Sequence, residues 1–164
     1  MLAPSTKPLF KGLDRADSFI VDPHKWLYAP FDACALVYRD PEDGRKAHTQ
    51  HGEYLDILTE TGDWNPSDYA YNLTRRVRGL PLWFSLATHG TAAYSDAVAQ
   101  NVDTAHAIAE VIRERGDLEL VREPELSVVV FKKKGWTLAD YDRWSAKLLD
   151  SGLGFVVPSS HKGE

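Results

Sequence analysis

A short apolar run, Phe19-Ile20-Val21, leads without a break into the string Asp22-Pro23-His24-Lys25-Trp26. Apolar and β-branched residues that stop at a proline predict a buried strand, here over residues 18–22, so Lys25 follows directly from the end of a strand. A lysine that reacts with an aldehyde gains from a rigid element behind it and from partial desolvation, which frees the amine. The dipeptide His-Lys is also common in solvated loops, so the motif alone leaves a reactive lysine and an ordinary surface lysine both open.

The longer string around Lys25 resembles the cofactor-lysine segment of the pyridoxal phosphate-dependent group II amino acid decarboxylases. That family includes aromatic amino acid, histidine and glutamate decarboxylases. Further segments at family-like spacing extend the resemblance over almost the whole chain: Gly12-Leu-Asp-Arg-Ala-Asp-Ser18, Phe31-Asp-Ala-Cys-Ala-Leu-Val-Tyr38, His51-Gly-Glu-Tyr-Leu55, Leu73-Thr-Arg-Arg-Val-Arg-Gly-Leu-Pro-Leu-Trp-Phe84 and Gly152-Leu-Gly-Phe-Val-Val-Pro158. Several ordered segments are far more specific than one motif.

The resemblance implies roles for three neighbouring residues. Lys25 forms the imine with pyridoxal 5′-phosphate, and His24 approaches the cofactor phosphate. Asp22 stands where many family members carry an asparagine that also touches the phosphate. A carboxylate repels a phosphate unless a donor intervenes, so the alternative is that Asp22 caps the turn before Pro23.

Tyr54 indicates the type of reaction. It lies 29 positions after Lys25, where the family's mobile loop carries a tyrosine thought to return a proton to the α-carbon once carbon dioxide has left. A phenol stays protonated at neutral pH and can donate a proton in a site that excludes water. In related enzymes where this position is phenylalanine, the outcome resembles aldehyde formation with oxygen, so tyrosine favours plain decarboxylation. The alternative is a loop aromatic that only packs.

The fold class expected is α/β. Residues 18–22 and 34–39 predict buried strands, residues 40–80 show no sustained period, and a helix is expected from Pro81. A second helix follows Gly90, with an apolar stripe that runs until Gly116: Tyr94, Val98, Val102, Ala105, Ile108, Ala109 and Ile112.

The C-terminal part predicts a small α+β unit. Strands are expected over residues 118–121, 127–131 and 155–157, and a helix over 138–149 with four inward residues: Tyr141, Trp144, Leu148 and Leu149. The resemblance then implies two domains. Residues 1–90 would end the large domain of a fold type I pyridoxal phosphate-dependent transferase, with a mobile catalytic loop over about 40–75. Residues 91–164 would form a truncated small domain.

Both ends of the chain are expected to be incomplete, because family members are much longer. The resemblance implies that three kinds of cofactor contact precede Met1: the acidic partner of the pyridine nitrogen, the histidine that stacks on the ring, and most phosphate ligands. It also implies a homodimer in which Arg75 or Arg78 makes ion pairs at the subunit contact.

Composition excludes several other classes. The net charge is −5 and the basic residues are scattered, which argues against nucleic acid as a partner. No apolar run approaches the roughly 20 residues of a membrane span, and no secretory signal is recognised, so a cytoplasmic protein is predicted. Cys34 is the single cysteine, which fits a reducing compartment, and it is expected to be a small core residue.

His48 and His51 are spaced as a possible metal pair, with Glu53 and Asp56 nearby. They lie in the least regular stretch of the sequence, whereas zinc sites draw ligands from fixed elements, so no metal is predicted.

The sequence therefore predicts decarboxylation of an L-amino acid to the amine and carbon dioxide by a carbon–carbon lyase. An aromatic substrate is favoured on overall likeness alone. This activity is expected of the full-length protein, and the fragment alone is expected to be inactive. The alternatives are a non-catalytic remnant, or an interaction domain that presents three aromatic residues to a partner: Trp64, Tyr69 and Tyr71.

Overall fold

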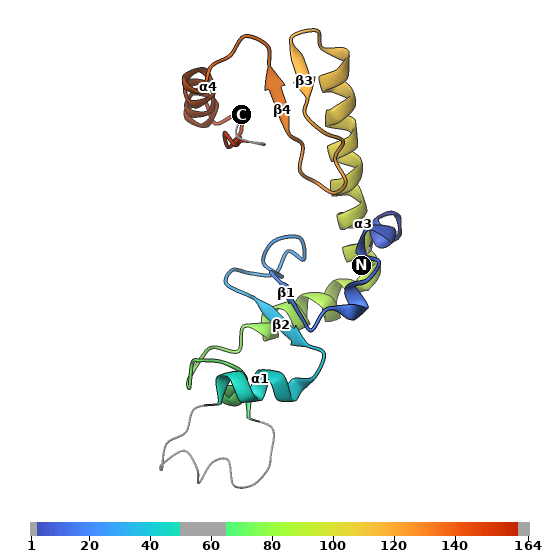
Figure 1. The fold of residues 1–164 in the computed structure, drawn as a ribbon, viewed down its shortest axis with the longest axis vertical. Coiled ribbons are helices and arrows are strands. Elements are labelled where there is room, and N and C mark those ends of the chain that lie inside the picture. The colour runs from blue at the N-terminus through green and yellow to red at the C-terminus, as the bar shows by residue number, and fades with distance from the viewer. Residues whose placement is uncertain (1–2, 50–64, 161–164) are drawn as a thin grey trace. The chain divides into compact units, whose positions relative to one another are not determined.

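The computed structural model describes residues 3–49 and 65–160 of the chain (Figure 1). The elements are three 3₁₀ helices, three α-helices and four strands within these residues: η1 (Pro4–Phe10), η2 (Leu13–Arg15), β1 (Ser18–Val21), β2 (Ala35–Tyr38), α1 (Pro41–His48), η3 (Pro66–Tyr69), α3 (Gly79–Glu114), β3 (Leu118–Leu120), β4 (Phe131–Lys133) and α4 (Leu138–Asp150).

The two strands predicted around Lys25 are present. β1 pairs with β2 in antiparallel register, from Ser18 opposite Tyr38 to Val21 opposite Ala35. The expectation that both strands are buried is wrong for the described residues, since Ile20 is 62% exposed and both strands carry further exposed apolar side chains. The physical reason is that this sheet has two strands in the described part of the chain, so no third strand flanks it there and several of its apolar side chains stay exposed.

Cys34 is also exposed, which corrects the prediction of a core residue. It lies just before the first residue of β2 and not within the strand. The buried position in this segment belongs to Ala33, which is 4% exposed. β2 begins at Ala35, so the strand predicted over residues 34–39 starts one residue too early.

Helix α1 lies within residues 40–80, where the sequence shows no sustained period and no helix was expected. The Asp40 side chain accepts a hydrogen bond from the backbone nitrogen of Glu42 at 3.0 Å, and Pro41 begins the helix. The helix packs near β2 through Gly44, where an added Cβ would lie 2.7 Å from the Tyr38 ring. Because α1 is polar on most of its surface, its sequence has no apolar stripe, but the Asp-Pro start and the acidic first turn were usable signals.

Helix α3 spans both predicted helices of the middle region. Gly90 has non-helical angles of φ 74° and ψ 162°, so the predicted break at this glycine is confirmed, while the helix begins at Gly79, before Pro81. The Tyr94 hydroxyl donates to Ser85 Oγ at 2.5 Å across the kink. The predicted stripe is buried except for Ile108, which is 46% exposed.

Strands β3 and β4 form an antiparallel hairpin in which Leu118 lies opposite Lys133 and Leu120 opposite Phe131. The predicted strand over 127–131 therefore overlaps β4 only at Phe131, and β4 continues to Lys133. No strand forms over 155–157, because these residues gain no hydrogen-bonded neighbour strand among those described. Their segment is instead attached to α4, since Ser145 Oγ donates to the carbonyl oxygen of Val156 at 2.5 Å.

Helix α4 confirms the last predicted helix. Thr137 and Asp140 form a capping box at its start. Tyr141 and Trp144 are half-buried, as is Leu148, whereas Leu149 is 55% exposed and was wrongly placed inward. A helix of this length buries one stripe, and Leu149 lies beside that stripe rather than on it.

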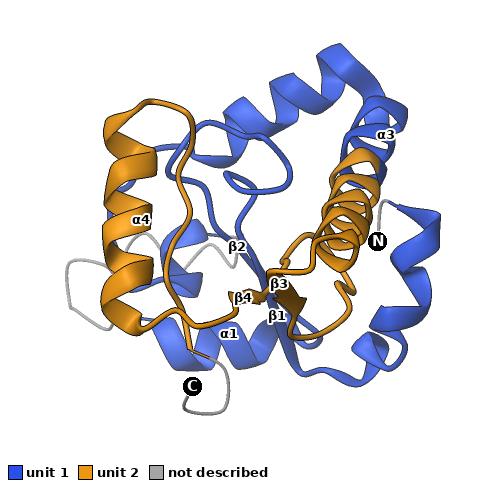
Figure 2. Ribbon diagram, turned by 90° about the horizontal axis from the view of Figure 1, so that it is seen from above, with its two compact units in different colours: residues 1–99 blue, residues 100–164 orange. Residues whose placement is uncertain are grey.

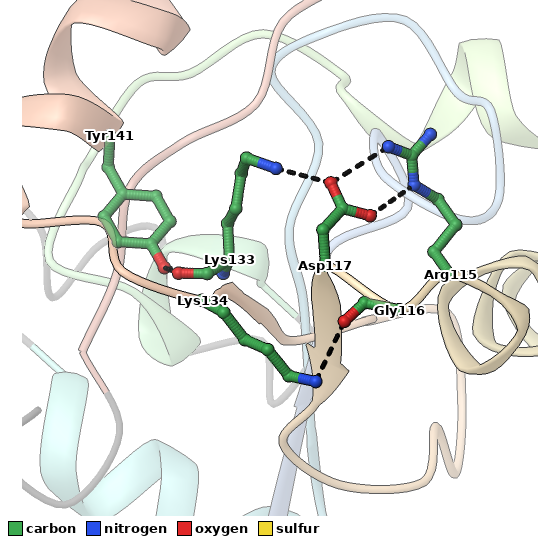
Figure 3. Close-up of polar contacts among 6 residues, drawn as sticks. All are labelled: Arg115, Gly116, Asp117, Lys133, Lys134 and Tyr141. Carbon is green, nitrogen blue, oxygen red and sulfur yellow. Dashed lines mark hydrogen bonds and ion pairs between the residues drawn. The ribbon is translucent and has the colours of Figure 1, made fainter.

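Asp117 connects the end of α3 to the β3–β4 hairpin (Figure 3). Its carboxylate accepts hydrogen bonds from Arg115 at 3.0 Å and pairs with Lys133 on β4. Lys134 Nζ donates to the carbonyl oxygen of Gly116 at 2.9 Å, and Tyr141 Oη accepts from the backbone nitrogen of Lys133 at 2.8 Å. These contacts hold the hairpin and α4 as one framework.

The chain divides into two compact units, residues 1–99 and 100–164 (Figure 2). The first contains β1, β2, α1 and η3, and the second contains β3, β4 and α4. The division into a large and a small domain at residue 90 stays a prediction. None of the helices in the described ranges is both long and apolar enough to cross a bilayer.

Candidate active site around Lys25

The chain reverses in a compact turn directly after β1. The carbonyl oxygen of Asp22 accepts a hydrogen bond from the Lys25 backbone nitrogen at 3.0 Å, and the carbonyl of Lys25 accepts from the nitrogen of Tyr28 at 3.2 Å. Tyr28 has φ 50°, a left-handed conformation that is uncommon for a bulky residue. The Pro23 carbonyl accepts from the Ala29 nitrogen at 3.0 Å and closes the turn. The turn therefore fixes the backbone of Lys25 relative to the strand.

The amine of Lys25 contacts the carboxylate of Asp22. The distance from Nζ to Oδ2 is 2.7 Å, and the two side chains are 68% and 33% exposed. The hydrogen bond from Lys25 is the main cause that lowers the pKa of Asp22, with smaller effects from the charges of Lys25 and His24. The partial desolvation expected for Lys25 is absent among the described residues, since its side chain is 68% exposed.

His24 is oriented by two contacts with the segment that leads into β2. Its Nδ1 lies 2.5 Å from the carbonyl oxygen of Ala33, and its ring meets that of Phe31 edge-on, with centroids 5.1 Å apart. A carbonyl oxygen can only accept, so Nδ1 carries the proton in this contact. The second ring nitrogen, Nε2, is then the atom through which His24 can meet a ligand.

The segment that orients His24 is itself attached to a distant residue. Arg78 Nε donates to Asp32 Oδ1 at 2.9 Å, across 46 residues of sequence. This hydrogen bond is the main cause that lowers the pKa of Asp32. Arg78 was considered for a subunit contact, and the structure gives it a partner within the chain. Sequence reasoning missed Asp32, since no local pattern indicates a partner so far along the chain.

Tyr54 lies outside the described residues, as do His51, Glu53, Asp56 and Trp64. The described residues on either side are anchored to one another. Arg45 Nε of α1 lies 3.9 Å from Asp68 Oδ2 of η3, and Arg75 donates to the carbonyl oxygen of Pro66. His48 is held by the Tyr38 hydroxyl at 2.9 Å. In the described ranges no group of three or more side chains is arranged as a metal site.

Comparison with known proteins identifies the family. The model of the pyridoxal-dependent decarboxylase conserved domain matches residues 1–134. The chain belongs to the pyridoxal-dependent decarboxylase family. Pyridoxal 5′-phosphate is the cofactor of this family, and the match includes the turn that carries Lys25.

Individual relatives agree with this assignment. The chain is 30% identical over 144 residues to an aromatic-L-amino-acid decarboxylase of Bacillus atrophaeus, covering 87% of this chain and 30% of that protein. It is 27% identical over 161 residues to a phenylacetaldehyde synthase of Petunia hybrida, covering 92% of this chain and 32% of that protein. The chain therefore spans about a third of the length of these curated relatives.

The fold also resembles a solved structure of the family. The crystal structure of Oryza sativa TDC with PLP and tryptamine superposes with a TM-score of 0.86 at 25% identity, covering 98% of this chain and 35% of that chain. The described elements are thus consistent with part of a fold type I enzyme, the fold class predicted from the sequence.

The residues around Lys25 fit part of a pyridoxal phosphate site. The cofactor aldehyde requires a primary amine, and Lys25 presents an exposed one on a turn whose backbone is fixed. His24 offers a ring nitrogen on the same turn. Asp22 fits a phosphate contact less well, because its carboxylate is negative and is already engaged by Lys25.

Proposed function

We propose that this chain is the lysine-bearing part of an enzyme that decarboxylates an L-amino acid to the amine and carbon dioxide. The observation that carries the proposal is the exposed Lys25 amine, presented by the turn after β1 and held 2.7 Å from Asp22. Because the chain spans about a third of its relatives, the activity is proposed for the longer protein that contains it.

Lys25 is proposed to bind the cofactor covalently through Nζ. When bound, pyridoxal phosphate withdraws electrons from the bond between the substrate α-carbon and its carboxylate. The amine must lose a proton before it can act as a nucleophile, and in the ion pair it donates a hydrogen bond to the carboxylate of Asp22. Asp22 is thus proposed to act through its contact with the amine of Lys25. A contact with the cofactor phosphate is its alternative role.

His24 is proposed to contact the cofactor phosphate. Its Nδ1 is occupied by the Ala33 carbonyl, so the ring can rotate little without losing that hydrogen bond. With both ring nitrogens protonated, Nε2 would donate a hydrogen bond to a phosphate oxygen, and such a bond between opposite charges is stronger than one between neutral groups.

Tyr54 is proposed as the proton donor to the substrate α-carbon. The phenol of a tyrosine in water has a pKa of about 10, so such a group carries its proton at neutral pH. An aromatic substrate is proposed as well, supported by the relatives named for aromatic amino acids and by the solved structure that contains tryptamine. We also propose a homodimer.

Borohydride reduction tests the assignment of Lys25. The full-length protein is saturated with pyridoxal phosphate, reduced with borohydride and digested. The modified peptide is then identified by mass spectrometry. The label is expected on Lys25, to disappear in K25A, and to persist in the control K11A, since Lys11 is an exposed lysine away from the turn. A label on any other lysine would contradict the proposal.

A non-catalytic interaction domain is the alternative that the exposed aromatic residues favour. Tyr71 is 83% exposed, and Phe31 is 85% exposed beside the turn. The spectrum separates the two functions, because an enzyme that binds the cofactor through Lys25 turns yellow on addition of pyridoxal phosphate. An interaction domain stays colourless.

A further inference from the structure

We propose that the ion pair between Asp32 and Arg78 is a positioning device for the Lys25 turn. It fixes the segment over residues 29–33, and that segment fixes His24. The inference rests on the proposed function, in which this turn binds the cofactor. It assigns a role to two residues that contact neither substrate nor cofactor in that proposal.

The first step is that residues 29–33 fold back on the turn at three points. The Ala29 nitrogen donates to the Pro23 carbonyl at 3.0 Å, the Ala33 carbonyl accepts from His24 at 2.5 Å, and Phe31 packs edge-on against the His24 ring. Ala29 and Ala33 are 6% and 4% exposed, so both ends of the segment are buried. Any movement of the segment therefore moves His24.

The second step is that the segment's exposed middle needs an anchor. Phe31 is 85% exposed and Asp32 follows it, so packing alone holds this part weakly. The Asp32 carboxylate instead accepts the hydrogen bond from Arg78 at 2.9 Å. A hydrogen bond between opposite charges is shorter and stronger than one between neutral groups.

The third step is that the anchor is on a fixed element. Arg78 directly precedes α3, and the Arg78 nitrogen donates to the carbonyl of Arg76 at 2.9 Å. The Leu80 nitrogen of α3 donates to the Val77 carbonyl at 3.2 Å. The guanidinium therefore extends from the start of a long helix, and the ion pair transmits the position of that helix to the segment beside Lys25.

The expected effect is modest, because Arg78 and Asp32 are 39% and 46% exposed and water screens their attraction. Arg76 also contributes positive charge near Asp32. Removing Arg78 alone thus leaves the attraction between Arg76 and Asp32. Exchanging the two charges is a sharper test, because it restores the ion pair only if residues 32 and 78 act on each other.

Hydrogen–deuterium exchange of residues 23–33 tests the positioning role in the natural protein without cofactor. D32N and R78Q are expected to exchange about two- to fivefold faster than the parental protein, and the double variant D32R/R78D is expected to return toward the parental rate. The control R122Q removes an exposed ion pair with Glu125 of 3.2 Å in the other unit and is expected to leave this exchange unchanged. If the swapped variant does not fold, R78K takes its place, with an expected rate between those of R78Q and the parental protein.

Cofactor titration supplies the second readout. The dissociation constant of pyridoxal phosphate is expected to rise in D32N and R78Q by about the same factor as the exchange rate. At saturating cofactor, borohydride reduction is still expected to label Lys25 fully. Parental exchange rates in both single variants, or faster exchange with unchanged cofactor affinity, would overturn the positioning role. Absence of Lys25 labelling in the parental protein would instead overturn the proposed function on which it rests.

Discussion

Asp22 and Lys25 form an ion pair within the turn that follows β1, with Oδ2 and Nζ 2.7 Å apart. The residue expected to contact the cofactor phosphate is thus in contact with the amine expected to bind the cofactor aldehyde. An amine that is engaged by this carboxylate is not free to approach the aldehyde. The carboxylate of Asp22 therefore influences how readily Lys25 captures the cofactor.

Replacing Asp22 by asparagine is expected to speed cofactor capture. The neutral amide no longer forms the ion pair, so the Lys25 amine is freer to approach the cofactor aldehyde. The yellow absorbance is expected to form about two- to fivefold faster after mixing with pyridoxal phosphate, a modest factor because the pair is exposed. D17N is the matched control, since Asp17 is an exposed carboxylate whose nearest cation, at 3.8 Å, is Arg39. Slower capture in D22N would indicate that Asp22 accepts the proton of Lys25 or assists the phosphate.

Replacing Tyr54 by phenylalanine is expected to reduce formation of the amine product by about 10²-fold or more, because the proposed proton donor is removed. With dissolved oxygen as the oxidant, the aldehyde, ammonia and hydrogen peroxide are expected to form in its place. Product analysis by chromatography, with Y71F as the control for loss of a hydroxyl at an exposed tyrosine, measures both outcomes. Parental amine formation without aldehyde would remove the proposed role of Tyr54.

Local periodicity predicted much of the fold. The stripe on α3 that includes Val98, Val102 and Ala109 is buried as expected, because three- and four-residue spacing places these side chains on one face. The same reasoning failed for α1, whose surface is polar and whose packing depends on one small residue, Gly44. Periodicity detects a helix by its buried stripe, so a helix without one is visible only through its capping residues.

The candidate site could be predicted only in part. Lys25, His24 and Asp22 are close in sequence, and the turn that joins them follows from an apolar run ending at Pro23. The link between Asp32 and Arg78 could not be predicted, because the two residues lie 46 positions apart and neither lies in a periodic pattern. Long-range ion pairs depend on how the elements assemble, which local sequence does not specify.

Asp117 is expected to make the second unit sensitive to acid. Hydrogen bonds from Arg115, and then from Lys133, hold its pKa well below the usual range. A carboxyl group whose pKa is lowered by folding stabilises the protein above the unfolded value of about 4, and this stabilisation is lost as the pH falls through the lowered pKa. The parental protein is therefore expected to lose more thermal stability than D117N on acidification below about pH 4.

Thermal unfolding followed by circular dichroism between neutral and acidic pH measures this difference. D142N serves as the control, since Asp142 is an exposed carboxylate on α4 and its loss is expected to leave the acid response at its parental size. Equal acid responses of D117N and the parental protein would show that the contacts of Asp117 do not contribute to folding stability.

Gly44→Ala is expected to destabilise the contact between α1 and β2. An added Cβ would lie 2.7 and 2.8 Å from two atoms of the Tyr38 ring, and the hydrogen bond from the Tyr38 hydroxyl to His48 at 2.9 Å restrains that ring from moving away. Alanine gains about 1 kcal/mol of helix propensity over glycine, whereas overpacking costs about 1–3 kcal/mol, so the net free energy of unfolding is expected to fall. Urea unfolding measures it, with G79A as the control, because a Cβ at Gly79 meets nothing within 4 Å. A G44A protein as stable as G79A would show that α1 can move away from β2 at no cost.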